Sequence, residues 1–300
     1  MKSSLFSVGK KGSAGSCSLF NILKEAVYQL ESAGIENPRM EAEILLAHFL
    51  KISRIELYTR WNEECPHFRD FQTLVTRRAR HEPSAYIVGE REFWSLDFIV
   101  APGVLIPRPE TEFVVEAVLR FSPGAALIID VGTGSGNIAV CLAKEIPTAR
   151  IFALDISEAA LSVARQNAAR HRVSGQITFL RADLLSAFAQ YLPFRKIDCV
   201  ASNLPYIPPS DIPFLSPEVC TFEPQGALDG GGADGLDCYR RLIHETRGIL
   251  KVGGLLIMEM GSGQKEALVR EVHNHGYEVQ EILSDYAGID RILVARLSGC

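Results

Sequence analysis

The stretch LIIDVGTGSGNIAV, residues 127–140, decides the fold class of this chain. An apolar run leads into three closely spaced glycines, Gly132, Gly134 and Gly136, and a helical pattern of apolar residues follows them. Glycines between a buried strand and a helix allow the backbone to turn sharply and to approach a ligand closely. The stretch therefore predicts a strand, a ligand-binding loop and a helix, in that order.

Strand and helix patterns alternate on the C-terminal side of this loop. The predicted strands span 126–131, 150–155, 176–180, 197–202 and 255–260, and the predicted helices span 137–146, 157–171 and 235–250. Such alternation is typical of an α/β fold with a mostly parallel, doubly wound sheet. Two last strands, 277–283 and 291–297, pair most easily as an antiparallel hairpin around Ala287-Gly288, with which the sheet ends.

The N-terminal part of the chain has a different texture. Helical periodicity starts at Leu19, with Ser18 as the predicted cap, and Asn37-Pro38 opens a second helix that runs through Leu50. A third helix is expected across 68–80. We therefore predict a disordered Ser-, Gly- and Lys-rich tail at 1–18, a helical domain at 19–83, a β-hairpin linker at 84–105 and the α/β domain at 106–300.

Composition excludes several classes of protein. Of the 300 residues 47% are hydrophobic and 22% are charged, which is ordinary for a globular protein, and no apolar run approaches the length of a membrane span. Seven scattered cysteines without metal-ligand spacing predict free thiols in the cytoplasm and no metal site. The net charge of −5 argues against direct DNA binding, and we interpret the local basic cluster at 69–81 as a solvated helix face.

Two carboxylates near the glycine loop indicate what it binds. Asp155 ends the next strand in IFALDIS, where a carboxylate can take both hydroxyls of a ribose. Asp130 immediately precedes the loop, whose spacing is GxGxG and not the GxGxxG of dinucleotide sites; a carboxylate there would repel a pyrophosphate and suits a ligand with positive charge. S-adenosylmethionine, with a sulfonium and an ammonium group, meets both requirements.

A third carboxylate, Asp183 in FLRADLL, ends the following strand, where it can accept a hydrogen bond from an adenine amino group. Three acids at successive strand ends make a chance arrangement of helix caps an inferior explanation. The predicted cofactor-binding residues at this point are Asp130, Gly132, Thr133, Gly134, Ser135, Gly136, Asp155 and Asp183.

Six segments, together, resemble one family closely. They are RRARHEPSAYIVGEREFW (77–94), IPRPETE (106–112), DVGTGSGNIA (130–139), ALDIS (153–157), SNLPYIP (202–208) and FEPQGALDGGGADGLDCYRRL (222–242). This set is similar to the HemK/PrmC family of protein-(glutamine-N5) methyltransferases, which modify peptide chain release factors. The resemblance runs in order from about Leu19 to Leu297 and so covers nearly the whole chain.

The resemblance implies a Rossmann-like class I S-adenosylmethionine-dependent methyltransferase behind an N-terminal helical domain. Because the catalytic domain alone offers only a pocket for one side chain, we expect the helical domain at 19–83 to dock the protein substrate. The resemblance also implies a target glutamine in the Gly-Gly-Gln loop of a release factor, held by Asn203, Leu204, Pro205 and Tyr206, with Asn203 and Tyr206 as catalytic residues. Asn203 also belongs to the implied cofactor site, as does Leu184, where relatives often have an aromatic side chain. Leucine at 204 departs from the family pattern Asn-Pro-Pro-Tyr; it keeps the carbonyl acceptor but adds an N–H group.

Two other functions use the same motifs. An adenine amino-methyltransferase acting on DNA or RNA would present Asn203 to an exocyclic amine and stack the flipped base on Tyr206. The acidic net charge and the 222–242 segment argue against it. A non-catalytic S-adenosylmethionine-binding homologue would explain Leu204, but Asp155, Asn203 and Tyr206 are intact. The expected protein is a monomer whose partners are release factors.

Overall fold

The computed structural model describes residues 17–65, 68–191 and 196–299. The predicted tail at 1–18 lies almost entirely outside the described residues. The chain divides into two compact units, one ending at Val88 and the other beginning at Gly89.

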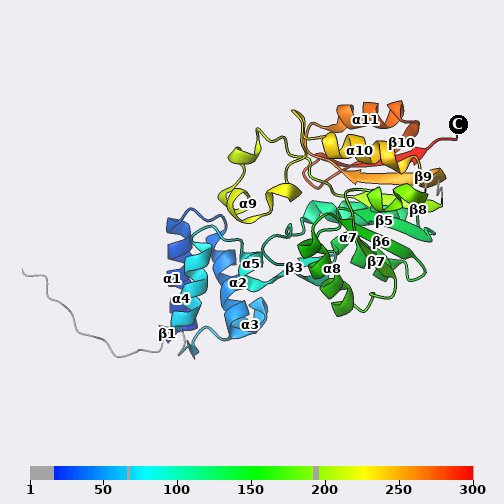
Figure 1. Cartoon of the computed structure of the whole chain (residues 1–300). Helices are drawn as coiled ribbons and strands as arrows, with labels where there is room; N and C mark the ends of the chain where they lie inside the picture. Colours follow the sequence, from blue (N-terminus) through cyan, green and yellow to red (C-terminus); the bar gives the residue numbers. More distant parts are fainter. Residues whose placement is uncertain (1–16, 66–67, 192–195, 300) are drawn as a thin grey trace, which may run out of the picture. The chain divides into compact units, whose positions relative to one another are not determined.

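The first unit is helical, as predicted (Figure 1). Its elements are β1 (Cys17–Ser18), α1 (Leu19–Ser32), α2 (Pro38–Leu50), α3 (Arg54–Thr59), β2 (Glu64–Cys65), α4 (Phe68–Arg78) and α5 (Ser84–Val88). The Ser18 side chain caps α1 by accepting from the Asn21 amide at 3.4 Å, and Pro38 occupies the first turn of α2. Apolar stripes on α1, α2 and α4 meet in a core that includes Leu30, Leu45, Leu46 and Phe71.

Two details of this unit differ from the sequence prediction. Helix α3 was not expected, although Ser53 and Glu56 form a capping box that marks its start. The basic cluster is not a wholly solvated face either, because Arg78 is buried and forms a 2.7 Å ion pair with Glu41 of α2. The sequence pattern concealed this pair because the two residues lie far apart in the chain.

The predicted β-hairpin linker at 84–105 is corrected by the structure. Residues 84–88 form helix α5, and the hairpin itself is shorter, with β3 (Glu90–Phe93) paired to β4 (Leu96–Ile99) in antiparallel fashion. Both turn residues, Trp94 and Ser95, have positive φ, which matches a tight two-residue hairpin turn. Phe93 and Phe98 are buried in the core of the second unit, so the hairpin is part of that unit and not a free linker.

The second unit is built on a seven-stranded sheet with the order β10-β11-β9-β8-β5-β6-β7. Strands β5, β6, β7, β8 and β9 are parallel, and β10 and β11 form the predicted antiparallel hairpin. The strands span β5 (Leu127–Val131), β6 (Arg150–Asp155), β7 (Ile177–Arg181), β8 (Ile197–Ser202), β9 (Leu250–Glu259), β10 (Tyr277–Ser284) and β11 (Asp290–Leu297). The doubly wound architecture is confirmed.

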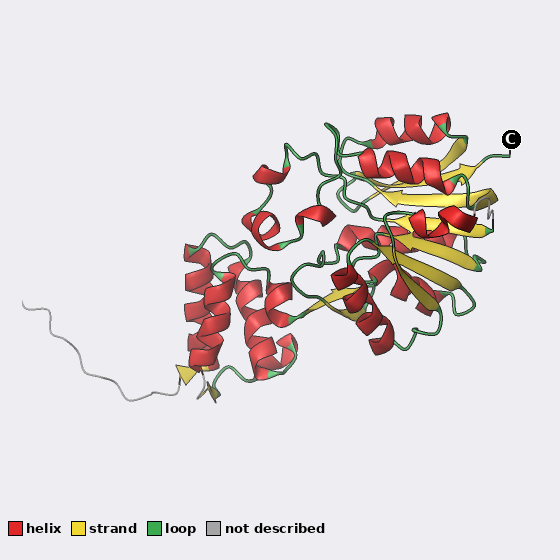
Figure 2. Ribbon diagram, in the orientation of Figure 1, coloured by secondary structure: helices red, strands yellow, loops and turns green. Residues whose placement is uncertain are grey.

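Helices cover both faces of this sheet (Figure 2). One core contains apolar residues of α6 (Glu112–Phe121), α7 (Asn137–Glu145) and α8 (Glu158–Arg170). The other contains those of α10 (Asp237–Thr246), α11 (Lys265–Asn274) and the 3-10 helix η2 (Ser186–Tyr191). The remaining short helices are η1 (Pro109–Thr111), η3 (Ile212–Phe214), α9 (Pro217–Phe222) and η4 (Gln225–Ala227); α6, α9 and α11 were not predicted.

The parallel strands decide where a ligand can bind. Their carboxyl ends, Val131, Asp155, Arg181 and Ser202, lie at one edge of the sheet, so the loops that follow them converge there. Across the described ranges 17–65, 68–191 and 196–299, no helix is long and apolar enough to cross a membrane.

Candidate active site

The glycine loop lies between β5 and α7 and has the backbone that only glycine adopts readily. Gly132, Gly134 and Gly136 have φ values of 74°, 54° and 81°. A Cβ at Gly136 would lie 3.0 Å from the Cβ of Ala164, and one at Gly132 would lie 2.9 Å from Cδ2 of Leu204. The loop therefore packs closely against both α8 and the segment after β8.

Asp130 supports this loop from inside the protein. Its Oδ2 accepts from the Thr133 hydroxyl at 2.6 Å and from the Ala139 amide at 3.2 Å, while burial raises its pKa to about 7. Its Oδ1 is buried without a hydrogen-bond partner among the described residues. The side chain does not line the cavity described next, so its visible role is to hold the loop.

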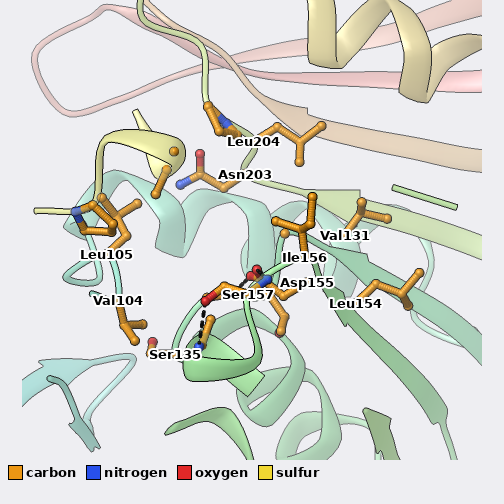
Figure 3. A pocket seen from close by; sticks show the side chains of 18 of the residues that line it. Val104, Leu105, Val131, Ser135, Leu154, Asp155, Ile156, Ser157, Asn203 and Leu204 are labelled. Atoms are coloured by element: carbon orange, nitrogen blue, oxygen red, sulfur yellow. Dashed lines mark hydrogen bonds between the residues drawn. The ribbon is translucent and has the colours of Figure 1, made fainter. Parts of the chain in front are cut away.

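A cavity of about 440 Å³ opens beside the loop, within the second unit (Figure 3). Figure 3 shows Asn203 and Leu204 on one side of it and Asp155 and Ser157 on the other. Ten predicted site residues line it: Gly132, Thr133, Gly134, Ser135, Asp155, Asp183, Leu184, Asn203, Leu204 and Pro205. Asp130, Gly136 and Tyr206 are not lining residues, and a further wall between Gly103 and Thr111 was not predicted.

Asp155 and Asp183 differ in their surroundings. Asp155 accepts from the Gly134 amide at 2.9 Å and the Ser157 amide at 2.8 Å, and burial raises its pKa. Asp183 is about half exposed and accepts from Arg241 at 2.9 Å. The next residue, Leu184, is buried with a φ of 47°, which is strained for a leucine. Asp183 and Leu184 both line the cavity, shortly after the end of β7.

Asn203 is the first residue beyond β8, and its amide group is held from one side. Its Nδ2 donates to Oγ1 of Thr111 at 2.9 Å, and the Thr111 hydroxyl donates to Oε2 of Glu259 at 2.7 Å. No hydrogen bond reaches the Asn203 Oδ1 from the part of the chain that the structure describes. The oxygen is left for a ligand in the cavity that Asn203 lines.

Tyr206 reaches the same carboxylate from another direction. Its hydroxyl donates to Oε1 of Glu259 at 3.3 Å. Glu259 is only 1% exposed, and burial raises its pKa to about 7. Sequence reasoning missed both Glu259 and Thr111. Signals existed for each, because Thr111 lies within IPRPETE and Glu259 is an acid inside the apolar run LLIMEM.

Both the backbone N–H group and the side chain of Leu204 have partners in the structure. Its amide donates to the Tyr239 hydroxyl at 3.1 Å, so the N–H group that proline lacks is satisfied. Its side chain is 5% exposed and occupies the space beside Gly132. The Tyr239 hydroxyl in turn donates to the Glu259 carbonyl at 2.5 Å. The departure from the Asn-Pro-Pro-Tyr pattern therefore leaves no unpaired polar group at this position.

Glycines of the segment 222–242 pack against the loop that follows β8 and contains Asn203 and Tyr206, called the Asn203 loop below. A Cβ at Gly235 would lie 2.2 Å from the carbonyl oxygen of Tyr206, and one at Gly230 would lie 2.8 Å from its Cα. Gln264 donates to the Tyr206 carbonyl at 2.7 Å, and Glu223 accepts from Arg108 at 2.6 Å. Three motifs that are distant in sequence thus meet around one loop.

The composition of the cavity fits S-adenosylmethionine. Its volume lies in the range of small-molecule sites, and its lining combines apolar side chains with the carboxylates of Asp155 and Asp183. The lining Ser135 has a buried Oγ with no partner among the described residues, and the glycine loop leaves space that side chains would fill. The sheet and this cavity define a class I S-adenosylmethionine-dependent methyltransferase.

Comparison with known proteins is more specific. Residues 21–89 match the profile of the PrmC N-terminal domain, and residues 124–288 match that of a methyltransferase domain. The chain is 45% identical over 280 residues to the release factor glutamine methyltransferase of Moorella thermoacetica, covering 91% of this chain and 96% of that protein. The corresponding protein of Geobacter sulfurreducens is 40% identical over 270 residues, covering 89% and 93%. The chain belongs to the release factor glutamine methyltransferase family.

Gly235 gives a test of how the Asn203 loop is supported. Gly235→Ala places a Cβ against the Tyr206 carbonyl at a φ of 73°, so we expect the free energy of unfolding to fall by about 3–5 kcal/mol. The matched control is Gly263→Ala, which has a φ of 81° but open space around the new Cβ and should cost only about 1–2 kcal/mol. Equal losses in chemical denaturation would contradict the close packing inferred here.

Proposed function

We propose that this protein transfers a methyl group from S-adenosylmethionine to the side-chain amide nitrogen of the glutamine in the Gly-Gly-Gln loop of peptide chain release factors. The observation that best supports this proposal is the position of the Asn203 side-chain amide at the cavity. Its Nδ2 donates a hydrogen bond to Thr111, and its Oδ1 has no hydrogen-bond partner among the described residues. The names and close similarity of the relatives support the same substrate. The alternatives of an adenine methyltransferase and a non-catalytic homologue have no comparable support.

The proposed reaction requires the protein to orient a weak nucleophile, the amide nitrogen of the substrate glutamine. An amide nitrogen is a poor nucleophile because its lone pair is delocalised into the carbonyl group. Oδ1 of Asn203 accepts one N–H of the substrate amide and the Leu204 carbonyl accepts the other, which aligns the nitrogen for in-line attack. Both acceptors also favour the positive charge that grows on the nitrogen. S-adenosylmethionine supplies the methyl group from its sulfonium centre.

Tyr206 contributes a ring and not a base. Burial and the neighbouring Glu259 raise the pKa of its hydroxyl, which stays protonated and donates to Glu259. Although Tyr206 does not line the cavity of this structure, we propose that its ring offers a flat face to the substrate amide and to the developing cation. No strong base is required, because the alkylated nitrogen becomes acidic and releases its proton to water.

The cofactor is assigned to the residues at the strand ends. The loop from Gly132 to Gly136 gives backbone approach, and Asp155 accepts from the ribose hydroxyls. Asp183 accepts from the adenine amino group, and Leu184 gives apolar contact to the adenine without stacking. Asp130 holds the loop in place, and Asn203 borders both the cofactor and the substrate.

The helical unit that ends at Val88 is proposed to dock the release factor. The catalytic cavity accommodates one side chain, so the recognition of a whole protein needs another surface. The match of residues 21–89 to a domain of its own supports a separate role.

We further propose that the protein works as a monomer in the cytoplasm and does not contact DNA directly. The net charge of −5 disfavours DNA binding, and free thiols suit the cytoplasm; those described are Cys65, Cys141, Cys199, Cys220 and Cys238.

The ribose assignment predicts a loss of cofactor affinity. Asp155→Ala should weaken S-adenosylmethionine binding by about 1–3 kcal/mol in calorimetry, the usual result of losing a charged hydrogen-bond acceptor. Glu158→Ala is the control, because it removes an exposed carboxylate three residues further on that does not line the cavity. An unchanged affinity of the Asp155 variant, with its fold intact, would remove Asp155 from the site.

The catalytic assignment predicts a loss of turnover. Asn203→Ala removes one of two amide acceptors, so the methylation rate of release factor should fall by ~10²–10³ while cofactor affinity changes little. The assay uses labelled S-adenosylmethionine with release factor, DNA and RNA in parallel, and melting temperatures are measured alongside. Asn274→Ala, at an exposed position on α11, serves as control. Near-normal turnover of a folded Asn203→Ala protein would refute the mechanism.

The docking assignment predicts that the two activities can be separated. A chain that begins at Gly89 should bind S-adenosylmethionine like the full chain, because the cavity lies within the second unit. It should lose methylation of intact release factor, measured with the same labelled cofactor. Normal methylation by the shortened chain would show that docking uses another surface.

A further inference from the structure

A line of hydrogen bonds runs from the cavity to a buried carboxylate. Asn203 Nδ2 donates to the Thr111 hydroxyl at 2.9 Å, and that hydroxyl donates to Glu259 Oε2 at 2.7 Å. Thr111 is 2% exposed and Glu259 is 1% exposed, so water does not compete for these bonds. Neither residue was expected from the sequence to act on the reaction.

We propose that Thr111 and Glu259 are positioning residues, which fix the Asn203 side chain with its oxygen, and not its nitrogen, facing the cavity. This inference rests on the function proposed above and adds to it. An asparagine amide is nearly symmetric in shape, so packing alone does not distinguish its two orientations. Only the orientation with Oδ1 towards the substrate accepts a substrate N–H.

The direction of the hydrogen bonds follows from the charge at their end. Above its pKa of about 7 the Glu259 carboxylate is ionised and only accepts, so the single hydrogen of the Thr111 hydroxyl is given to Glu259. Oγ1 of Thr111 can then only accept from Asn203. A flipped amide would bring its oxygen against Oγ1 with no hydrogen between them, and would point its NH₂ group at the substrate NH₂.

The surroundings of Glu259 suit a carboxylate that accepts one hydrogen bond on each of its two oxygens. Its other oxygen, Oε1, accepts from the Tyr206 hydroxyl at 3.3 Å, so both oxygens face donors. Burying a carboxylate is unfavourable without such partners, and burial raises its pKa to about 7 even with them. A merely structural contact here would be served as well by an apolar pair, whereas directing Asn203 requires an acceptor.

The test replaces the threonine hydroxyl while keeping the shape of the side chain. Thr111→Val should lower kcat for release factor methylation about tenfold to 100-fold, less than or equal to the loss in Asn203→Ala, with the KM for S-adenosylmethionine unchanged. Thr111→Ser keeps the hydroxyl and should retain most of the activity. Thr246→Val is the matched control, because Thr246 is also buried, its hydroxyl is hydrogen-bonded at 2.7 Å to Tyr277, and neither residue lines the cavity. It should lower the melting temperature without lowering kcat.

The outcomes separate this inference from the proposed function. If the unmodified protein does not label release factor, the proposed function fails. If it does, and Thr111→Val keeps its kcat or Thr111→Ser loses as much as Thr111→Val, the positioning role is refuted. Should Thr111→Val not fold, Glu259→Gln is the second variant; it leaves only one accepting oxygen for two hydroxyls and should lower kcat severalfold at unchanged cofactor KM. An unchanged kcat there would equally overturn the proposal.

Discussion

The parallel pairing of β5 with β8 is the constraint on which the rest of the site depends. In this pairing Val131 lies opposite Ser202, and the Ser202 hydroxyl donates to the Val131 carbonyl at 2.9 Å. The next residues along the two strands, Gly132 and Asn203, are therefore neighbours. A side chain at 132 would meet Leu204, so the glycine is required by the neighbouring strand as well as by its own turn. One register of hydrogen bonds thus brings together the glycine loop and the loop that contains Asn203.

Each of these two loops is held by hydrogen bonds to a buried carboxyl group. Asp130 lies beneath the glycine loop and holds Thr133, and Glu259 lies beneath Asn203 and holds Thr111. Burial raises the pKa of both carboxyl groups to about 7, because removing their charged forms from water is unfavourable. Each lies beneath a polar loop that borders the cavity. In both loops a buried acceptor thus fixes a polar side chain beside the cavity.

The family motifs make sense as parts of a single contact region. IPRPETE supplies Arg108 and Thr111, the 222–242 segment supplies Glu223 and the glycines behind Tyr206, and SNLPYIP supplies the loop that they surround. None of these contacts is local, since Asn203 and Thr111 are separated by 92 positions. Leucine at 204 is accommodated within the same region, because Tyr239 accepts its N–H group. The motif departs from the family pattern without disturbing the hydrogen bonds around it.

The sequence by itself determined the features that depend on local periodicity and on residue type. Alternating apolar runs predicted the strands of the sheet, including 150–155 and 197–202, whose bounds agree with β6 and β8. Glycine spacing and acids at strand ends predicted six residues that line the cavity, and the family resemblance implied four more, Leu184, Asn203, Leu204 and Pro205. Local patterns predict part of a hairpin at 84–88, where the structure has helix α5, and they do not predict α6, α9 and α11. Short or irregular amphipathic segments depend on packing partners, which one sequence window does not contain.

Only the tertiary structure decided what the site residues touch. It showed Asp130 beneath the loop and not in the cavity, placed Tyr206 outside the lining with its hydroxyl on Glu259, and joined Thr111 to Asn203. The physical reason is that a sequence pattern specifies on which strand end a side chain lies, whereas its hydrogen-bond partner is set by strand order and register. Those depend on contacts between residues far apart in the chain, and they become visible only when the chain has folded.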